Sequence, residues 1–330
     1  MRGAGWPVAD GWRWVAQGGG RASSEARPGP SASVGRALPG CRPLGYSACM
    51  LAAPVELLVI DAQNDFCDLP DAWCPADPAT GARLAPALPV PGAHADMLRL
   101  AALVDRLGDR LDGITCTLDS HHRHDIAHPR YWRRGDGQPV APFTPITAAQ
   151  VRAGEFLPRE GGRLDATLAY LDALEARGRY TLMVWPVHCQ LGSWGHGLHP
   201  AVMSACNRWE DRAARPVRVS IKGDHPYTEH YSVFEAEVPD PAVPITQLNR
   251  ALLARLDGAA TVLVAGEASS HCVRASVEHL VTHLPSGRPE QVVLLTDCMS
   301  PVTGFEAQAE GFLAAMAHRG VRLARSTDLA

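Results

Sequence analysis

Short apolar runs that alternate with helix-like stretches constrain the fold of this 330-residue chain more than any other feature. The run Val55–Ile60 is typical of a buried parallel strand, and a helix is expected over His94–Leu107. Five further strands are expected, at Gly113–Thr117, Thr181–Val184, Arg218–Ile221, Thr261–Ala265 and Gln291–Leu295. Further helices are expected at Pro200–Trp209, Pro244–Leu256, His271–His283 and Glu306–Arg319. This alternation predicts an α/β fold with a six-stranded, mainly parallel sheet that helices cover on both faces.

Two segments depart from the alternation. Residues 1–49 are rich in Gly, Ser, Pro and Arg and contain only Asp10 and Glu25 as acids, so we expect a disordered extension before a domain over 50–330. A transit peptide is the rival interpretation of that segment. Residues 122–180, called the insertion below, are largely polar and irregular, although leucines near their end have helical spacing. We expect the insertion to lie near the functional site and to alter the pocket wall.

Composition argues against several classes of function. The net charge of −4 offers no electrostatic attraction to nucleic acid or to a membrane surface, and no apolar run approaches the roughly 20 residues of a spanning helix. Nine cysteines occur singly, without a CxxC pair, which favours reduced thiols and a cytoplasmic location. No phosphate-binding glycine motif or GxSxG elbow is present, so nucleotide binding and serine hydrolysis have no support.

Chemically reactive side chains follow the ends of the predicted strands. Taken singly, an aspartate after a strand is usually a turn or cap residue, and a lone cysteine is usually a small buried hydrophobe. Because parallel strands end at one edge of a sheet, however, we expect these residues to meet there. They are Asp61, Asp119, His121, His188, Lys222 and Cys272.

Three of these residues suit covalent catalysis. Lys222 is the only lysine among 31 basic residues, and a lysine differs from an arginine in its compact charge and tunable pKa. A helix start and a nearby ammonium would both favour the thiolate of Cys272. Asp61 can accept the proton and return it to a leaving amine, while backbone N–H groups of the Gly266–Cys272 loop can stabilise an oxyanion.

Asp119, His121 and His188 form a second group, with the donor set of a metal site. One carboxylate and two imidazoles suit Zn²⁺, Fe²⁺ or Mn²⁺, and Zn²⁺ is our first expectation. His128 is a candidate fourth ligand.

Five motifs resemble those of nicotinamidases, within the isochorismatase-like cysteine hydrolases. They occur in the family's order through most of residues 54–324, and together they are far more specific than any one of them. The matching segments are Asp61–Cys67, Asp119–His121, Trp185–Cys189, Lys222–Gly223 and Gly266–Val273.

The resemblance implies a fold, a reaction and a set of roles. The fold would be a three-layer α/β/α sandwich, and Cys272 would form a thioester with release of ammonia, assisted by Asp61 and Lys222. The backbone N–H groups of Ala268 and Cys272 would form the oxyanion hole, with a cis peptide before Ala268. Phe66 and Trp185 would line the pocket of nicotinamide, whose ring nitrogen would face the metal. The resemblance also implies a homo-oligomer.

Departures from the family pattern leave the substrate open. The insertion separates motifs that compact nicotinamidases bring closer, Glu267 replaces an apolar residue, and Ser270 stands where an aspartate is common. One alternative is a related hydrolase of isochorismate, a carbamoyl compound or another small amide; members of the isochorismatase type generally lack the metal motif. Another is a member that only binds a ligand or partner, against which the intact Asp61, Lys222 and Cys272 set argues.

Overall fold

The computed structural model describes residues 51–329. The extension predicted over 1–49 lies outside the described residues and stays a prediction.

Six strands form one parallel sheet, and the first strand of the sequence lies near its centre. The strand order is β10–β9–β8–β1–β2–β7. Their bounds are Val55–Ile60 (β1), Gly113–Asp119 (β2), Arg218–Lys222 (β7), Thr261–Gly266 (β8), Val292–Leu295 (β9) and Arg322–Ala324 (β10). Every residue of β1 is buried, because β2 and β8 flank it and helices cover both faces of the sheet. The predicted α/β sandwich with a six-stranded sheet is confirmed.

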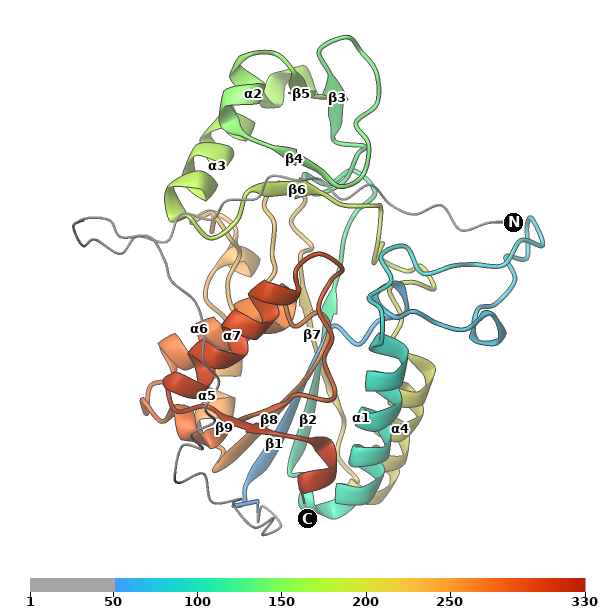
Figure 1. Ribbon diagram of the computed structural model, residues 1–330, viewed down its shortest axis with the longest axis vertical. Coiled ribbons are helices and arrows are strands. Elements are labelled where there is room, and N and C mark those ends of the chain that lie inside the picture. The colour runs from blue at the N-terminus through green and yellow to red at the C-terminus, as the bar shows by residue number, and fades with distance from the viewer. Residues whose placement is uncertain (1–50, 330) are drawn as a thin grey trace, which may run out of the picture. The chain divides into compact units, whose positions relative to one another are not determined.

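Helices form the outer layers (Figure 1). One layer contains α1 (Ala93–Leu107) and α4 (Pro200–Ala213), and the other contains α5 (Arg250–Asp257), α6 (Cys272–His283) and α7 (Glu306–His318). Successive side chains of a strand point to opposite faces. Leu57 and Val59 therefore belong to the core beneath α1 and α4, while Leu58 and Ile60 belong to the core beneath the other layer. Burying each such side chain contributes roughly 1.5–3 kcal/mol.

The insertion forms a small substructure with its own core. β3 (Trp132–Arg134) pairs antiparallel with β5 (Phe156–Pro158), and β4 (Thr144–Ile146) pairs antiparallel with β6 (Leu182–Val184). Two helices complete it, α2 (Ala148–Arg152) and α3 (Leu164–Arg177), at the top of Figure 1. Its core is separate from the two cores on the faces of the sheet and includes Trp132, Leu171 and Leu174. The helical spacing of the leucines predicted that they pack in this way. Short 3₁₀ helices lie at 64–66, 71–73, 108–110, 161–163, 244–246, 289–291 and 326–328.

Two predictions about elements are wrong. Thr181–Val184 was expected in the parallel sheet, but β6 pairs only with β4, and β10 is the sixth strand instead. An apolar run indicates a buried strand without specifying its partner. β10 has little apolar pattern, because its first and last residues are only partly buried and Leu323 between them is exposed. The helix expected over Pro244–Leu256 is divided, because Asn249 accepts a hydrogen bond from the N–H of Leu252 and starts α5 there.

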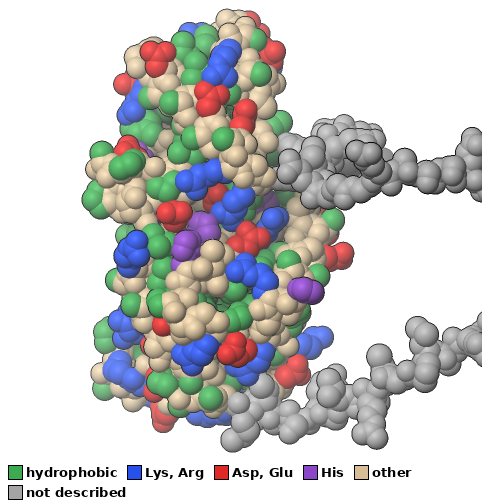
Figure 2. Space-filling view, turned by 90° about the vertical axis from the view of Figure 1, so that its left-hand side faces the viewer, with side chains coloured by type: hydrophobic (Ala, Val, Ile, Leu, Met, Phe, Trp, Pro, Cys, Tyr) green, Lys and Arg blue, Asp and Glu red, His purple; other side chains and the backbone are tan. Residues whose placement is uncertain are grey.

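Within residues 51–329, no helix combines the length and the apolar character needed to cross a membrane. Figure 2 shows acidic and basic side chains interspersed over the face in view. The seven cysteines in the described part of the chain are all free and buried.

Candidate active site

Lys222 lies at the centre of the site. It is the last residue of β7, and its side chain is fully buried at the carboxyl edge of the sheet. Its Nζ lies 3.0 Å from Asp61 Oδ2, 2.8 Å from Asp119 Oδ1 and 3.6 Å from Cys272 Sγ. Burial lowers the pKa of the Lys222 ammonium, but Asp119 and Asp61 raise it more, so its pKa lies well above the ordinary value. The three residues predicted to be catalytic therefore lie together, with Asp61 and Cys272 beside the positive charge of Lys222.

Asp61 follows β1 directly and has an unusual backbone. Its φ of 45° lies in the left-handed region, which is uncommon for residues other than glycine and occurs preferentially at functional sites. Thr117 of β2 holds it on both sides: the threonine hydroxyl accepts from the Asp61 N–H and donates to Asp61 Oδ1 at 2.5 Å. Burial raises the pKa of the Asp61 carboxyl, although Lys222 opposes this. A carboxylate with a raised pKa suits a proton acceptor near neutrality.

Cys272 is the first residue of α6 and lies within 4.8 Å of carboxylate oxygens of Asp61 and Asp119. Burial raises the pKa of its thiol well above the ordinary value, although the ammonium of Lys222 lowers it. The sequence favoured a stabilised thiolate, whereas burial favours the neutral thiol. An attack by Cys272 therefore needs a base within reach, and Asp61 meets that need.

The loop before Cys272 presents free backbone donors. The peptide between Glu267 and Ala268 is cis, as expected. Among residues 51–329, no acceptor receives the N–H groups of Ala268 and Cys272. Gly266, at the end of β8, has φ of +120°, and a Cβ there would lie 1.9 Å from the carbonyl oxygen of Ile60, so only glycine allows the loop to start against β1.

Asp119, His121 and His188 lie together, as predicted. Asp119 Oδ2 is 3.0 Å from His121 Nε2 and 3.5 Å from His188 Nε2, and all three side chains are buried. His188 reaches this position from the loop after β6, which is outside the parallel sheet, so the argument from strand ends does not explain it. Buried imidazoles facing a carboxylate have the chemistry of a divalent metal site.

The insertion contributes Asp125 and His128 to this cluster. His121, His128 and His188 each offer one nitrogen within 4.8 Å of the others. Asp125 Oδ2 lies 3.0 Å from His121 Nδ1, and the carbonyl of His122 lies 3.0 Å from His128 Nδ1. Partners of this kind orient metal-binding imidazoles and leave Nε2 for the ion. The residues present therefore fit a divalent metal.

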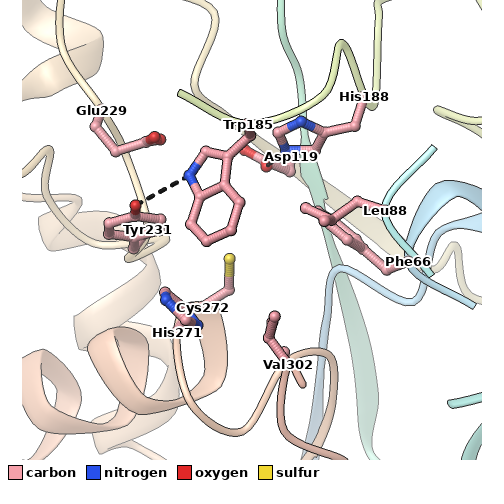
Figure 3. A pocket seen from close by; sticks show the side chains of 11 residues that line it. Phe66, Leu88, Asp119, Trp185, His188, Glu229, Tyr231, His271, Cys272 and Val302 are labelled. Atoms are coloured by element: carbon pink, nitrogen blue, oxygen red, sulfur yellow. Dashed lines mark hydrogen bonds and ion pairs between the residues drawn. The ribbon is translucent and has the colours of Figure 1, made fainter. Parts of the chain in front are cut away.

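The pocket above Cys272 contains about 360 Å³ of empty space, part of it open to solvent (Figure 3). Two aromatic residues predicted to bind substrate, Phe66 and Trp185, lie on its opposite sides. The full lining is Phe66, Leu88, Asp119, Trp185, His188, Glu229, Tyr231, Ala268, His271, Cys272 and Val302. The lining is mainly apolar and includes several aromatic side chains, which suits a small aromatic molecule.

Sequence reasoning missed several of these lining residues. Glu229 and Tyr231 lie in the loop after β7, and His271 directly precedes Cys272. Their positions beyond strand ends were a usable signal. The expectation that the insertion alters the pocket wall is wrong: no residue of 122–180, all of which are described, lines this pocket. The insertion packs around its own core, and it contacts a lining loop where the hydroxyl of Tyr170 accepts from the N–H of Glu229.

Comparisons with known proteins show which solved structures share this fold. No protein-family model matches the chain, and no curated protein sequence matches it. Among solved structures, a nicotinamidase/pyrazinamidase of Acinetobacter baumanii aligns at 20% identity, with a TM-score of 0.54, over 84% of this chain and 98% of that one. The yeast nicotinamidase bound to the inhibitor nicotinaldehyde aligns at 16% identity, with a TM-score of 0.54, over 82% and 99%. The resemblance seen in the motifs therefore holds at the level of the fold, which this chain shares with structurally characterised nicotinamidases.

Proposed function

We propose that the protein is a metal-assisted cysteine amidohydrolase of the nicotinamidase type, acting on a small aromatic amide through a thioester on Cys272. The observation that carries the proposal is the contact of Lys222 with Asp61, Asp119 and Cys272, because it joins the base, the metal cluster and the nucleophile. A protein that only binds a ligand has no need of three buried charged groups around a cysteine, since burying charges is costly.

The geometry supports a two-step reaction. Cys272 Sγ attacks the amide carbon while Asp61 accepts the thiol proton, and the carbonyl electrons move to oxygen, where the N–H groups of Ala268 and Cys272 can stabilise them. Collapse breaks the C–N bond, and Asp61 returns its proton to nitrogen, which leaves as ammonia. Water then attacks the thioester with Asp61 again accepting a proton. The C–S bond then breaks and Asp61 returns this proton to sulfur, yielding the acid and the free thiol.

The metal cluster supports the nicotinamidase type over the isochorismatase type. Asp119, His121 and His188 would hold a divalent ion, with His128 in the same cluster. When bound, such an ion supplies a Lewis-acid contact that orients a substrate. Asp119 also accepts from Lys222, so it positions the ammonium next to Asp61 and Cys272.

Ammonia release from a panel of small amides, beginning with nicotinamide and pyrazinamide, tests the proposal. We expect Cys272→Ala to lower kcat by roughly 10⁴-fold or more. Cys206→Ala removes another buried thiol, one on α4, and should keep the rate. Hydrolysis that survives in Cys272→Ala would contradict the assigned nucleophile, and hydrolysis of no amide by the metal-loaded protein would contradict the reaction.

A further inference from the structure

Glu229 is a buried carboxylate for which the proposed reaction has no role. It lies in the loop after β7, is 4% exposed, and lines the pocket that contains Cys272. Figure 3 shows its carboxylate directed toward the indole of Trp185. A buried charged group without a partner is costly, so its retention in a substrate pocket needs an explanation.

The two oxygens of Glu229 differ in their partners. Oε1 accepts a hydrogen bond of 2.9 Å from the N–H of His230, whereas Oε2 is buried and, within the described chain, has no hydrogen-bond partner. The other carboxylate lining the pocket, Asp119, has both oxygens engaged, with Lys222 and with the histidines. Glu229 thus offers the one unused carboxylate oxygen among the residues that line this pocket.

Neighbouring groups fix the backbone from which this carboxylate extends. The N–H of Glu229 donates to the hydroxyl of Tyr170 in the insertion at 3.1 Å, and its carbonyl accepts from the N–H of Glu237 at 2.9 Å. The nearby hydroxyl of Tyr231 already accepts from Trp185 Nε1. No hydrogen bond joins this hydroxyl or any other described group to Oε2, so Oε2 can accept from a group that a ligand brings.

We propose that Glu229 is a specificity-determining residue that accepts a hydrogen bond from a donor on the substrate ring, so that the preferred substrates are small aromatic amides with an amino or hydroxyl substituent. This inference rests on the proposed amidase function. The ring nitrogens of nicotinamide and pyrazinamide are acceptors and cannot satisfy a carboxylate oxygen. A site built around a hydrogen bond strongly rejects an analogue without the donor, because its own polar group is then left unpaired.

Matched pairs of ring-substituted nicotinamides, amino against methyl at each ring position, test the proposal in the metal-loaded protein. The two substituents are similar in size, and only the amino group donates. We expect at one position a preference for the amino compound in kcat/KM of roughly 10- to 100-fold, the range for a hydrogen bond to a charged group. In Glu229→Gln, the amide oxygen can keep the bond from His230 while the NH₂ faces the pocket. The amino preference should then disappear, and unsubstituted nicotinamide should gain relative to the amino compound.

The melting temperature and the zinc affinity of Glu229→Gln are also measured, to detect a loss of stability or of metal binding. An equal loss for amino and methyl substrates, together with weaker zinc binding, would overturn the proposal and assign Oε2 to the metal site. An amino-to-methyl ratio near one in the original protein, or a ratio that Glu229→Gln leaves unchanged, would also overturn it. In either case hydrolysis that depends on Cys272 would keep the amidase function, whereas no hydrolysis of any compound would refute that function itself.

Discussion

The carboxyl edge of the parallel sheet and the insertion make different contributions to the same site. At the sheet edge, Asp61, Lys222 and Cys272 come from three separate elements and contact one another directly. The insertion has its own core, contributes Asp125 and His128 to the metal cluster, and supports the Glu229 loop through Tyr170. In the proposed amidase, the sheet edge would hold the reacting groups, whereas the insertion would act on metal binding and on specificity without lining the pocket.

The largest effect expected from this comparison is at the sheet edge. Lys222→Arg should lower kcat by roughly 100- to 1000-fold, because a planar guanidinium cannot occupy the compact space between Asp61, Asp119 and Cys272. Arg163→Lys in the insertion is the matched exchange, at a cation stacked 3.2 Å from the ring centre of Tyr227, and should change kcat less than about twofold. Steady-state rates with a hydrolysed amide measure both. Similar losses in the two variants would remove the distinction between the regions.

A smaller difference is expected within the metal cluster. His188→Ala should weaken zinc binding by more than about 100-fold, since His188 faces Asp119 directly, whereas His128→Ala in the insertion should weaken it by about 10- to 100-fold. Competition with a chromophoric chelator measures both affinities. His318→Ala, on the exposed end of α7, is the control and should bind zinc normally. If His128→Ala proves the more damaging, the insertion supplies a principal ligand and the assignment must change.

The smallest effect expected concerns the support of Glu229. Tyr170→Phe removes the acceptor of the Glu229 N–H and should lower kcat/KM for amino-substituted substrates by about three- to tenfold. Tyr131→Phe removes another buried hydroxyl of the insertion, one that bonds Thr167 at 2.6 Å away from the pocket. Both variants should lose similar stability in thermal unfolding, but only Tyr170→Phe should change kinetics. A kinetic loss in Tyr131→Phe as well would indicate a general disturbance of the insertion.

Much of the fold followed from local patterns. The bounds of β1 were predicted as observed, and α1, α4, α6 and α7 were each located to within a few residues. β1 is a mainly apolar run, and α1 and α4 have strong apolar periodicity; both signals depend on the sequence alone. Thr181–Val184 shows the limit, because its apolar run predicted a strand correctly while its antiparallel partner β4 is set by the packing of the insertion.

The chain's sequence by itself determined the α/β sandwich, the reactive residues and the edge of the sheet at which most of them meet, because the topology of parallel strands brings their ends together. Only the tertiary structure decided that burial raises the pKa of the Cys272 thiol and that no residue of the insertion lines the pocket. It also decided that Glu229 lines the pocket and that, within the described chain, its Oε2 has no hydrogen-bond partner. These properties depend on which atoms surround a group and exclude water from it, and residues distant in sequence supply those atoms.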